Sequence, residues 1–77
     1  MDKKLVLETL AERIFPLTPD NLRRICLTNY ARTTVYAYLL RLRRQKLVER
    51  AFLNGRIGYR ITERGRKRLE YFRRKNK

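Results

Sequence analysis

The residues best suited to chemistry in this sequence are gathered in one stretch, RTTVYAYLLRLRRQ, at residues 32–45. The stretch combines arginines with threonines, tyrosines and an alanine, and it contains no acidic residue. Arginine guanidinium groups match phosphate and base edges, and a threonine hydroxyl can bond to either. A surface helix that is basic only by chance usually mixes both signs of charge, because opposite charges at i,i+4 stabilise it. The stretch therefore favours a face that binds a polyanion over a solvated basic face.

The overall charge indicates the same kind of partner. The 77 residues include 21 Lys or Arg, 15 of them Arg, against 7 Asp or Glu, and the formal charge is +14. Such an excess destabilises a folded chain through self-repulsion unless a polyanion offsets it. The alternative is a charge that serves solubility. At this density of arginine, nucleic acid is the first candidate partner.

Catalytic and metal chemistry find little support in the composition. The chain has no His and no Ser, so it lacks a Ser-His or Cys-His nucleophile pair and a zinc-finger ligand set. Its single cysteine, Cys26, is most simply a small core residue, with a reactive thiol as the alternative. Glu8 and Glu12 have the spacing of a solvated helix face. We expect a protein that is not an enzyme and that uses no metal or cofactor.

Length and hydropathy predict one small intracellular domain. Seventy-seven residues suffice for a single modest core and not for two. No apolar run comes near the length of about 20 residues that spans a membrane, and the first residues lack the form of a signal peptide. We therefore expect residues 1–77 to form one domain in the cytoplasm, without membrane contact.

The elements that position the basic stretch begin with a helix over residues 3–15, which Asp2 can cap and which Pro16 ends. Its apolar residues at i, i+3, i+4 and i+7 are Leu7, Leu10, Ala11 and Ile14.

A second short helix is predicted over residues 19–27. Thr18 can cap it, Pro19 suits its first position, and Asp20 lies where the helix dipole favours an acid. The residues that this helix is expected to bury are Leu22, Ile25 and Cys26.

The basic stretch forms the third predicted helix, after a short turn over residues 28–32. This gap is the one that a helix-turn-helix uses before its recognition helix, and Asn29 is the turn residue best able to adopt a left-handed conformation. At 100° per residue the core stripe comprises Val35, Leu39 and Leu42, with Tyr38 at its edge.

After residue 46 the pattern changes to a β-hairpin. Residues 47–53 and 56–61 flank Asn54-Gly55, the strongest short-range signal for a two-residue hairpin turn. This loop pairs Leu53 with Arg56, Phe52 with Ile57, and Glu49 with Arg60.

Thr62 opens a last helix, with Leu69 and Phe72 on its inner side and mostly basic residues around it. Gly65, in its first turn, costs about 1 kcal/mol of helix propensity against alanine. Close packing against a neighbouring backbone is the simplest compensation, and a phosphate contact at the helix start is the sharper alternative.

The side chains opposite the core stripe give the candidate contacts with nucleic acid. Thr33 can bond a base or a phosphate, the Ala37 methyl can meet a thymine methyl, and Tyr36 can reach either a phosphate or a base. Arg41 can read guanine or hold the backbone, whereas Arg44, near the helix end, favours phosphate. Leu40 can pack on the hairpin, on a partner or on a thymine methyl, and these alternatives stay open. The full candidate set is Arg32, Thr33, Thr34, Tyr36, Ala37, Arg41, Arg44, Asn54 and Arg56.

Two segments, TTVYAYLLRLRRQKLVER and NGRIGYRITERGRKRL, carry a family resemblance. They resemble the winged helix-turn-helix transcription regulators of archaea and bacteria, most of all small members from archaeal genomes, plasmids and viruses. The resemblance covers about residues 18–70. It implies an α+β fold with three helices, a two-stranded hairpin wing and a C-terminal helix. Many relatives have glycine where this chain has Lys46, which is a minor departure, and many dimeric ones have a longer, more apolar last helix.

The function expected from these features is sequence-specific binding of double-stranded DNA by a transcription regulator. Residues 32–45 would enter the major groove, and the tip at residues 54–56 would touch the backbone or the minor groove. An RNA-binding module and a protein-interaction winged helix are the alternatives. RNA is less favoured because RNA readers use exposed aromatic platforms, and the tyrosines here fall mostly at core or helix-edge positions.

We also expect a monomer in solution that can pair on a palindromic site. A dimer interface needs an apolar centre, and the terminal helices have few apolar residues to spare. In the first helix the residues assigned mostly to the core are Leu5, Val6, Leu7, Leu10, Ile14 and Phe15. In the last helix, Tyr71 is the only sizeable apolar residue beyond the inward stripe, and six basic residues would face their copies.

Overall fold

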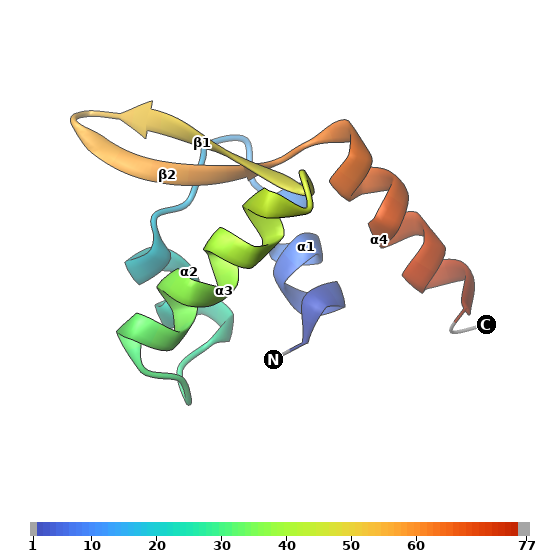
Figure 1. The fold of residues 1–77 in the computed structure, drawn as a ribbon, viewed down its shortest axis with the longest axis horizontal. Helices are drawn as coiled ribbons and strands as arrows, with labels where there is room; N and C mark the ends of the chain where they lie inside the picture. Colours follow the sequence, from blue (N-terminus) through green and yellow to red (C-terminus); the bar gives the residue numbers. More distant parts are fainter. Residues whose placement is uncertain (1, 76–77) are drawn as a thin grey trace.

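The computed structural model describes residues 2–75 and has the predicted order of elements (Figure 1). These elements are α1 (Lys3–Ala11), α2 (Pro19–Cys26), α3 (Arg32–Arg44), β1 (Val48–Leu53), β2 (Arg56–Ile61) and α4 (Glu63–Lys75). The β1–β2 hairpin extends to one side above α2 and α3, and α4 extends to the other side (Figure 1). The predicted α+β architecture of three helices, wing and C-terminal helix is confirmed.

Helix α1 is shorter than predicted. The Asp2 side chain caps it by accepting a hydrogen bond of 3.3 Å from the backbone N–H of Leu5. The helix ends at Ala11, so the predicted inward position of Ile14 is wrong, and 93% of Ile14 is exposed. The chain leaves the helix early because Leu17 must reach β2, where it exchanges two backbone hydrogen bonds with Tyr59, of 2.9 and 2.7 Å.

Helix α2 begins as predicted, with the Thr18 hydroxyl accepting a hydrogen bond of 3.1 Å from the backbone N–H of Asn21. The predicted burial of Leu22 is confirmed, but that of Ile25 is wrong, since 43% of Ile25 is exposed. The chain ends the helix at Cys26, and Leu27 turns into the core in its place.

The turn between α2 and α3 does not use a left-handed residue. Among residues 2–75 the non-glycine residues with positive φ are Lys46 and Asn54, so the expectation for Asn29 is wrong. The turn closes instead through a hydrogen bond of 3.1 Å from the Tyr30 N–H to the Leu27 carbonyl. Lys46 has a φ of 62°, a left-handed conformation that glycine adopts more easily than lysine. The glycine found here in many relatives of the winged-helix type would therefore suit the backbone better, and the lysine is strained.

The hairpin has the predicted register. Phe52 pairs with Ile57 and Glu49 with Arg60, whose Nε lies 2.7 Å from the Glu49 carboxylate. Asn54 and Gly55 have φ of 52° and 77°, as a two-residue turn with the twist of the strands requires.

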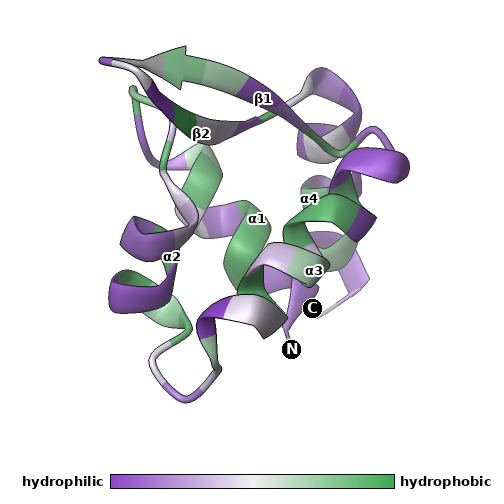
Figure 2. Ribbon diagram, turned by 60° about the vertical axis from the view of Figure 1, so that its left-hand side comes forward, coloured by the Kyte–Doolittle hydropathy of each residue, from purple (hydrophilic) through white to green (hydrophobic). Residues whose placement is uncertain are grey.

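One core joins these elements. The apolar stretches of α1 and α3 face the centre of the molecule, and hydrophilic residues prevail on α2 and along much of α4 (Figure 2). The predicted stripe of α3 is fully buried at Val35, Leu39 and Leu42. The other buried apolar residues include Val6, Leu7, Leu10, Leu17, Leu22, Leu27, Leu47, Val48, Tyr59, Ile61 and Leu69.

The start of α4 is held against the corner between α3 and β1. The Thr62 hydroxyl donates a hydrogen bond of 2.7 Å to the Lys46 carbonyl and accepts one of 3.0 Å from the Gly65 N–H. The Thr62 N–H donates a further bond of 3.0 Å to the Leu47 carbonyl. A Cβ atom at Gly65 would collide with that carbonyl oxygen and would lie 2.7 Å from Ile61 Cγ1. Close backbone packing, the simpler of the two expectations for Gly65, is confirmed.

This contact predicts an unusual sign for Gly65→Ala. The same change in an exposed helix normally stabilises by up to about 1 kcal/mol. Here we expect urea unfolding to show a loss of at least about 2 kcal/mol, because a backbone carbonyl cannot move away as a side chain can. Lys67→Ala, at an exposed position of the same helix, is the matched control and should change stability little. A Gly65→Ala variant as stable as the parent would contradict the packing at this corner.

Candidate nucleic-acid interface

The exposed face of α3 carries most of the predicted site. Among the nine candidate residues none is buried, and all are classed as solvent-exposed: Arg32, Thr33, Thr34, Tyr36, Ala37, Arg41, Arg44, Asn54 and Arg56. The core stripe fixes the rotation of α3, so this face has to point to solvent. The site is therefore an open surface rather than an enclosed cavity.

The flank of α3 next to the wing forms a groove. Its volume is about 670 Å³, and α2, α3 and both strands contribute to its lining. The structure brings together Arg32, Tyr36 and Arg56 there, from two separate segments of the sequence. Arg50 of β1 lies in the same groove. We call this feature the wing groove.

The opposite flank of α3 carries a different subset. Thr34, Ala37 and Arg41 line a shallow depression together with Tyr30 and Tyr38. Burial raises the pKa of the Tyr38 phenol, so this group stays neutral. Arg41 lines this depression and does not line the wing groove. The predicted site residues therefore fall into two groups, one on each flank of α3.

Between the two flanks runs the outermost line of α3. Helical spacing places Thr33, Ala37 and Arg44 there, with Leu40 alongside. Leu40 is 42% exposed, so part of its side chain is available to a ligand at this face. This line is the part of the helix that can approach a flat or grooved ligand most closely.

Arg32, at the start of α3, is held by Asp20 of α2. The Arg32 Nε lies 2.8 Å from Asp20 Oδ1, and a second guanidinium nitrogen contacts Oδ2. The hydrogen bond from Arg32 lowers the pKa of Asp20 below its ordinary value of 3.8, and the charges of Arg24 and Arg23 act in the same direction. The carboxylate therefore stays ionised at neutral pH, and protonation opens the pair only in acid below that value. The sequence placed Asp20 at the helix start but gave no signal for this partner.

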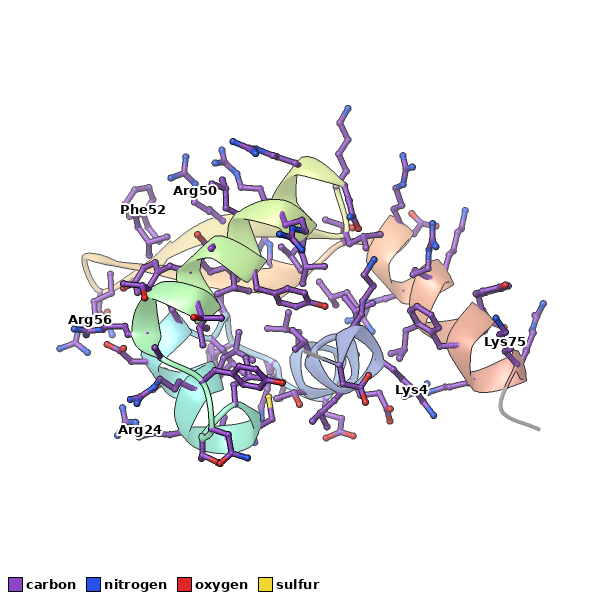
Figure 3. The ribbon with its side chains drawn as sticks, turned by 60° about the horizontal axis from the view of Figure 1, so that its bottom comes forward. Lys4, Arg24, Arg50, Phe52, Arg56 and Lys75 are labelled. Carbon is purple, nitrogen blue, oxygen red and sulfur yellow. The ribbon has the colours of Figure 1, made fainter. Side chains whose placement is uncertain are left out.

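Arg50 is the main site residue that sequence reasoning missed. It pairs with Tyr59 across the ladder, which places it on the face of the wing turned toward the helices. The hairpin register predicted from the Asn-Gly turn contained this information. Arg50 and Phe52 project from the same side of the wing, with Arg56 near the end of the molecule away from Lys4 and Lys75 (Figure 3).

The charge is unevenly distributed along the chain. Residues 19–61 contain ten Lys or Arg and two acids, Asp20 and Glu49. Both acids are paired with arginines, at Arg32 and Arg60. In α1 and α4, by contrast, Glu8 and Glu70 lie among the basic residues and pair with them. The α2–α3–wing segment therefore carries ten basic residues against two acids, and α4 is also strongly basic, with seven basic residues against two acids.

Within residues 2–75 no group of three or more His, Cys, Asp or Glu side chains is arranged to hold a metal ion. None of the helices in this range is both long and apolar enough to cross a bilayer.

The helices α1 to α3 followed by a β-hairpin define a winged helix-turn-helix. At the level of sequence, neither a protein-family model nor a curated protein matches the chain. Solved structures do match over nearly its whole length. A MarR family protein from Bacillus stearothermophilus has a TM-score of 0.80, covers 95% of this chain and is 25% identical. A PadR-like transcriptional regulator from Bacillus cereus has the same TM-score and coverage at 22% identity.

A third structure is that of MepR, a transcription regulator of the Staphylococcus aureus multidrug efflux pump MepA. It has a TM-score of 0.77, covers 91% of this chain and is 26% identical. The chain spans 50% of the MarR family protein, 78% of the PadR-like protein and 52% of MepR. These likenesses confirm the winged-helix fold and its similarity to transcription regulators. The closer resemblance to archaeal, plasmid or virus forms stays a prediction.

The pair between Asp20 and Arg32 leads to a prediction for Asp20→Asn. Loss of the carboxylate frees Arg32 and removes a negative charge from the basic face. We expect several-fold tighter binding to any duplex and a salt dependence of log K that is steeper by about one. Fluorescence anisotropy over a salt series measures both.

The matched control is Glu70→Gln. It removes the same charge and frees Arg74 in α4, outside the proposed DNA-binding surface. It should change the salt dependence much less than Asp20→Asn. Equal effects of the two variants would contradict a specific role for the pair at the start of α3.

Proposed function

We propose that the protein is a sequence-specific regulator of transcription that binds double-stranded DNA in the cytoplasm. The observation that carries this proposal is the exposed face of α3, whose arginines continue into the wing groove through Arg50 and Arg56. A helix of this kind fits the major groove, while the adjacent wing reaches the neighbouring backbone or minor groove. One structural neighbour, MepR, is a transcription regulator, which supports the same class of function.

In this proposal the side chains divide into positioning and reading groups. The small residues Thr33 and Ala37 let the backbone of α3 approach base edges. Arg41 and Tyr36 are the candidates for base contacts. Arg44 and Arg56 lie where contacts with phosphate are expected, and such contacts fix the register of the protein on the duplex. Helix α2 braces α3 over the backbone.

Two other functions compete with this one. An RNA-binding module gains some support because Tyr36 and Phe52 are 45% and 80% exposed, and aromatic rings stack on unpaired bases. A competition between duplex DNA and an RNA hairpin separates the two. A protein-interaction winged helix predicts a partner whose binding survives high salt, and the charge of the α2–α3–wing segment does not favour it.

The oligomeric state stays a prediction, and one of its premises is wrong. We expected Leu5, Ile14 and Phe15 to lie mostly in the core, but they are 42%, 93% and 68% exposed. Tyr71 is also 53% exposed. The repulsion between copies of the basic α4 still argues for a monomer in solution that pairs only on DNA, where phosphates screen the charge.

The electrostatic part of the proposal predicts a steep salt dependence. If the face neutralises about five or six phosphates, log K falls with log salt at a slope near −5. Binding of a non-specific duplex is also expected, with a similar slope. A slope shallower than about −2 would favour the protein-interaction function instead.

The reading part predicts different losses at different positions. Arg41→Ala and Tyr36→Ala should each reduce discrimination between a selected duplex and its scrambled form by about 1–3 kcal/mol, because a base contact is lost. Arg56→Ala should weaken both duplexes alike, since a wing tip mostly touches the backbone. Titrations of each variant with both duplexes provide the test. Equal losses on both duplexes at all three positions would mean that α3 does not read bases.

A further inference from the structure

The wing carries an apolar pair that the fold does not use. Phe52 and Ile57 lie opposite each other in the hairpin and are 80% and 40% exposed. Alternation along the strands places them on the same face as Val48 and Ile61, which are buried against the helices. The part of this face up to Tyr59 therefore packs against the core, and the part between Tyr59 and the wing tip is exposed to solvent. A single exposed apolar residue is ordinary on a protein surface. An exposed apolar pair across the two strands of a projecting hairpin forms a continuous patch that a ligand can contact.

The surroundings of this pair are basic. Phe52 and Ile57 line a shallow depression with Arg43, from the last turn of α3, and Arg50 of β1. The acid in the same lining is Glu49, whose carboxylate is bound by Arg60 at 2.7 Å. A planar apolar ring beside guanidinium groups complements a base step that has opened, because the uncovered base faces are flat and apolar and lie between phosphates.

The orientation of the pair also matches the proposed site. Arg50 lines both the wing groove and the depression around Phe52, so the two features adjoin along β1. Phe52 and Arg50 project from the same side of the wing (Figure 3). A duplex held by α3 would therefore meet Phe52 where the wing crosses its backbone.

We infer that Phe52, backed by Ile57, is an apolar wedge that enters a base step of the bound duplex and partly unstacks it. This inference rests on the proposed function and adds a mode of recognition to it. Apolar wedges of this kind kink a duplex, and the cost depends on how easily the step unstacks. The wing then selects flexible pyrimidine–purine steps such as TA without reading their base edges.

The test uses two duplexes that differ in flexibility and not in charge. Alternating d(TA) has a TA step at every second position, whereas the dA·dT homopolymer is stiff and has none. We expect the parent protein to prefer the alternating duplex and to raise the fluorescence of 2-aminopurine placed in its steps. Phe52→Ala should bind the alternating duplex about tenfold more weakly and lose the fluorescence rise, with an unchanged salt slope because no charge is removed.

The matched control is Phe15→Ala, since Phe15 is another exposed phenylalanine, at 68%, outside the wing. It should behave as the parent does on both duplexes. A Phe52→Ala variant that keeps the preference and the fluorescence rise would overturn the wedge.

The remaining outcomes distinguish failure of the wedge from failure of the proposed DNA-binding function. Equal binding of both duplexes by the parent, without a fluorescence rise, overturns the wedge and leaves DNA binding intact. Tighter binding of a separated single strand than of either duplex overturns it in favour of stacking on unpaired bases. No binding of any of these DNAs overturns the proposed function itself. Phe52→Ala that alters only the sedimentation of the protein overturns the wedge in favour of a contact between copies.

Discussion

One set of contacts at the start of α4 holds the corner between α3 and the wing, and the candidate site depends on where this corner places the wing. Thr62 bonds to the carbonyls of Lys46 and Leu47, and Gly65 lets α4 approach the same corner without a side chain between. At this corner the backbone of Lys46 adopts the left-handed conformation, with a positive φ. These contacts hold the corner in a position where Arg50 and the wing tip lie beside α3, and the wing groove is present without a ligand.

The second organising feature is the placement of the acids. Self-repulsion among 21 basic residues would be relieved most simply by scattering acids evenly, but residues 19–61 contain only two. One of them, Asp20, accepts hydrogen bonds from Arg32, and this contact joins the first turns of α2 and α3 across 12 residues of sequence. No periodicity in the sequence encodes such a pair, since it depends on how the two helices cross. The proposed DNA-binding surface thus has few acids, and Asp20 orients one of its arginines, Arg32, before a duplex binds.

Local signals in the sequence predicted most of the fold, because caps and turns act over a few residues. The hairpin register followed from Asn54-Gly55 alone, and the core stripe of α3 from its spacing. Predictions failed where a distant contact decides the outcome. Ile14 is exposed because the chain leaves α1 to reach β2. Ile25 is exposed because α2 ends at Cys26, and the residue that enters the core there is Leu27. For the site, exposure at all nine candidates agrees with the structure, but their division into two flanks and the part of Arg50 required the packed arrangement.

We propose that α3 and the wing, rather than the basic helix α4, form the surface that binds DNA. NMR spectroscopy of the ¹⁵N-labelled 9.4 kDa protein, titrated with a duplex, tests it most directly. We predict that the amide shifts concentrate in residues 32–44 and 48–57 and at the start of α2, while α1 and the outer face of α4 change little. Shifts concentrated along residues 64–75, with α3 and the wing unaffected, would contradict the account.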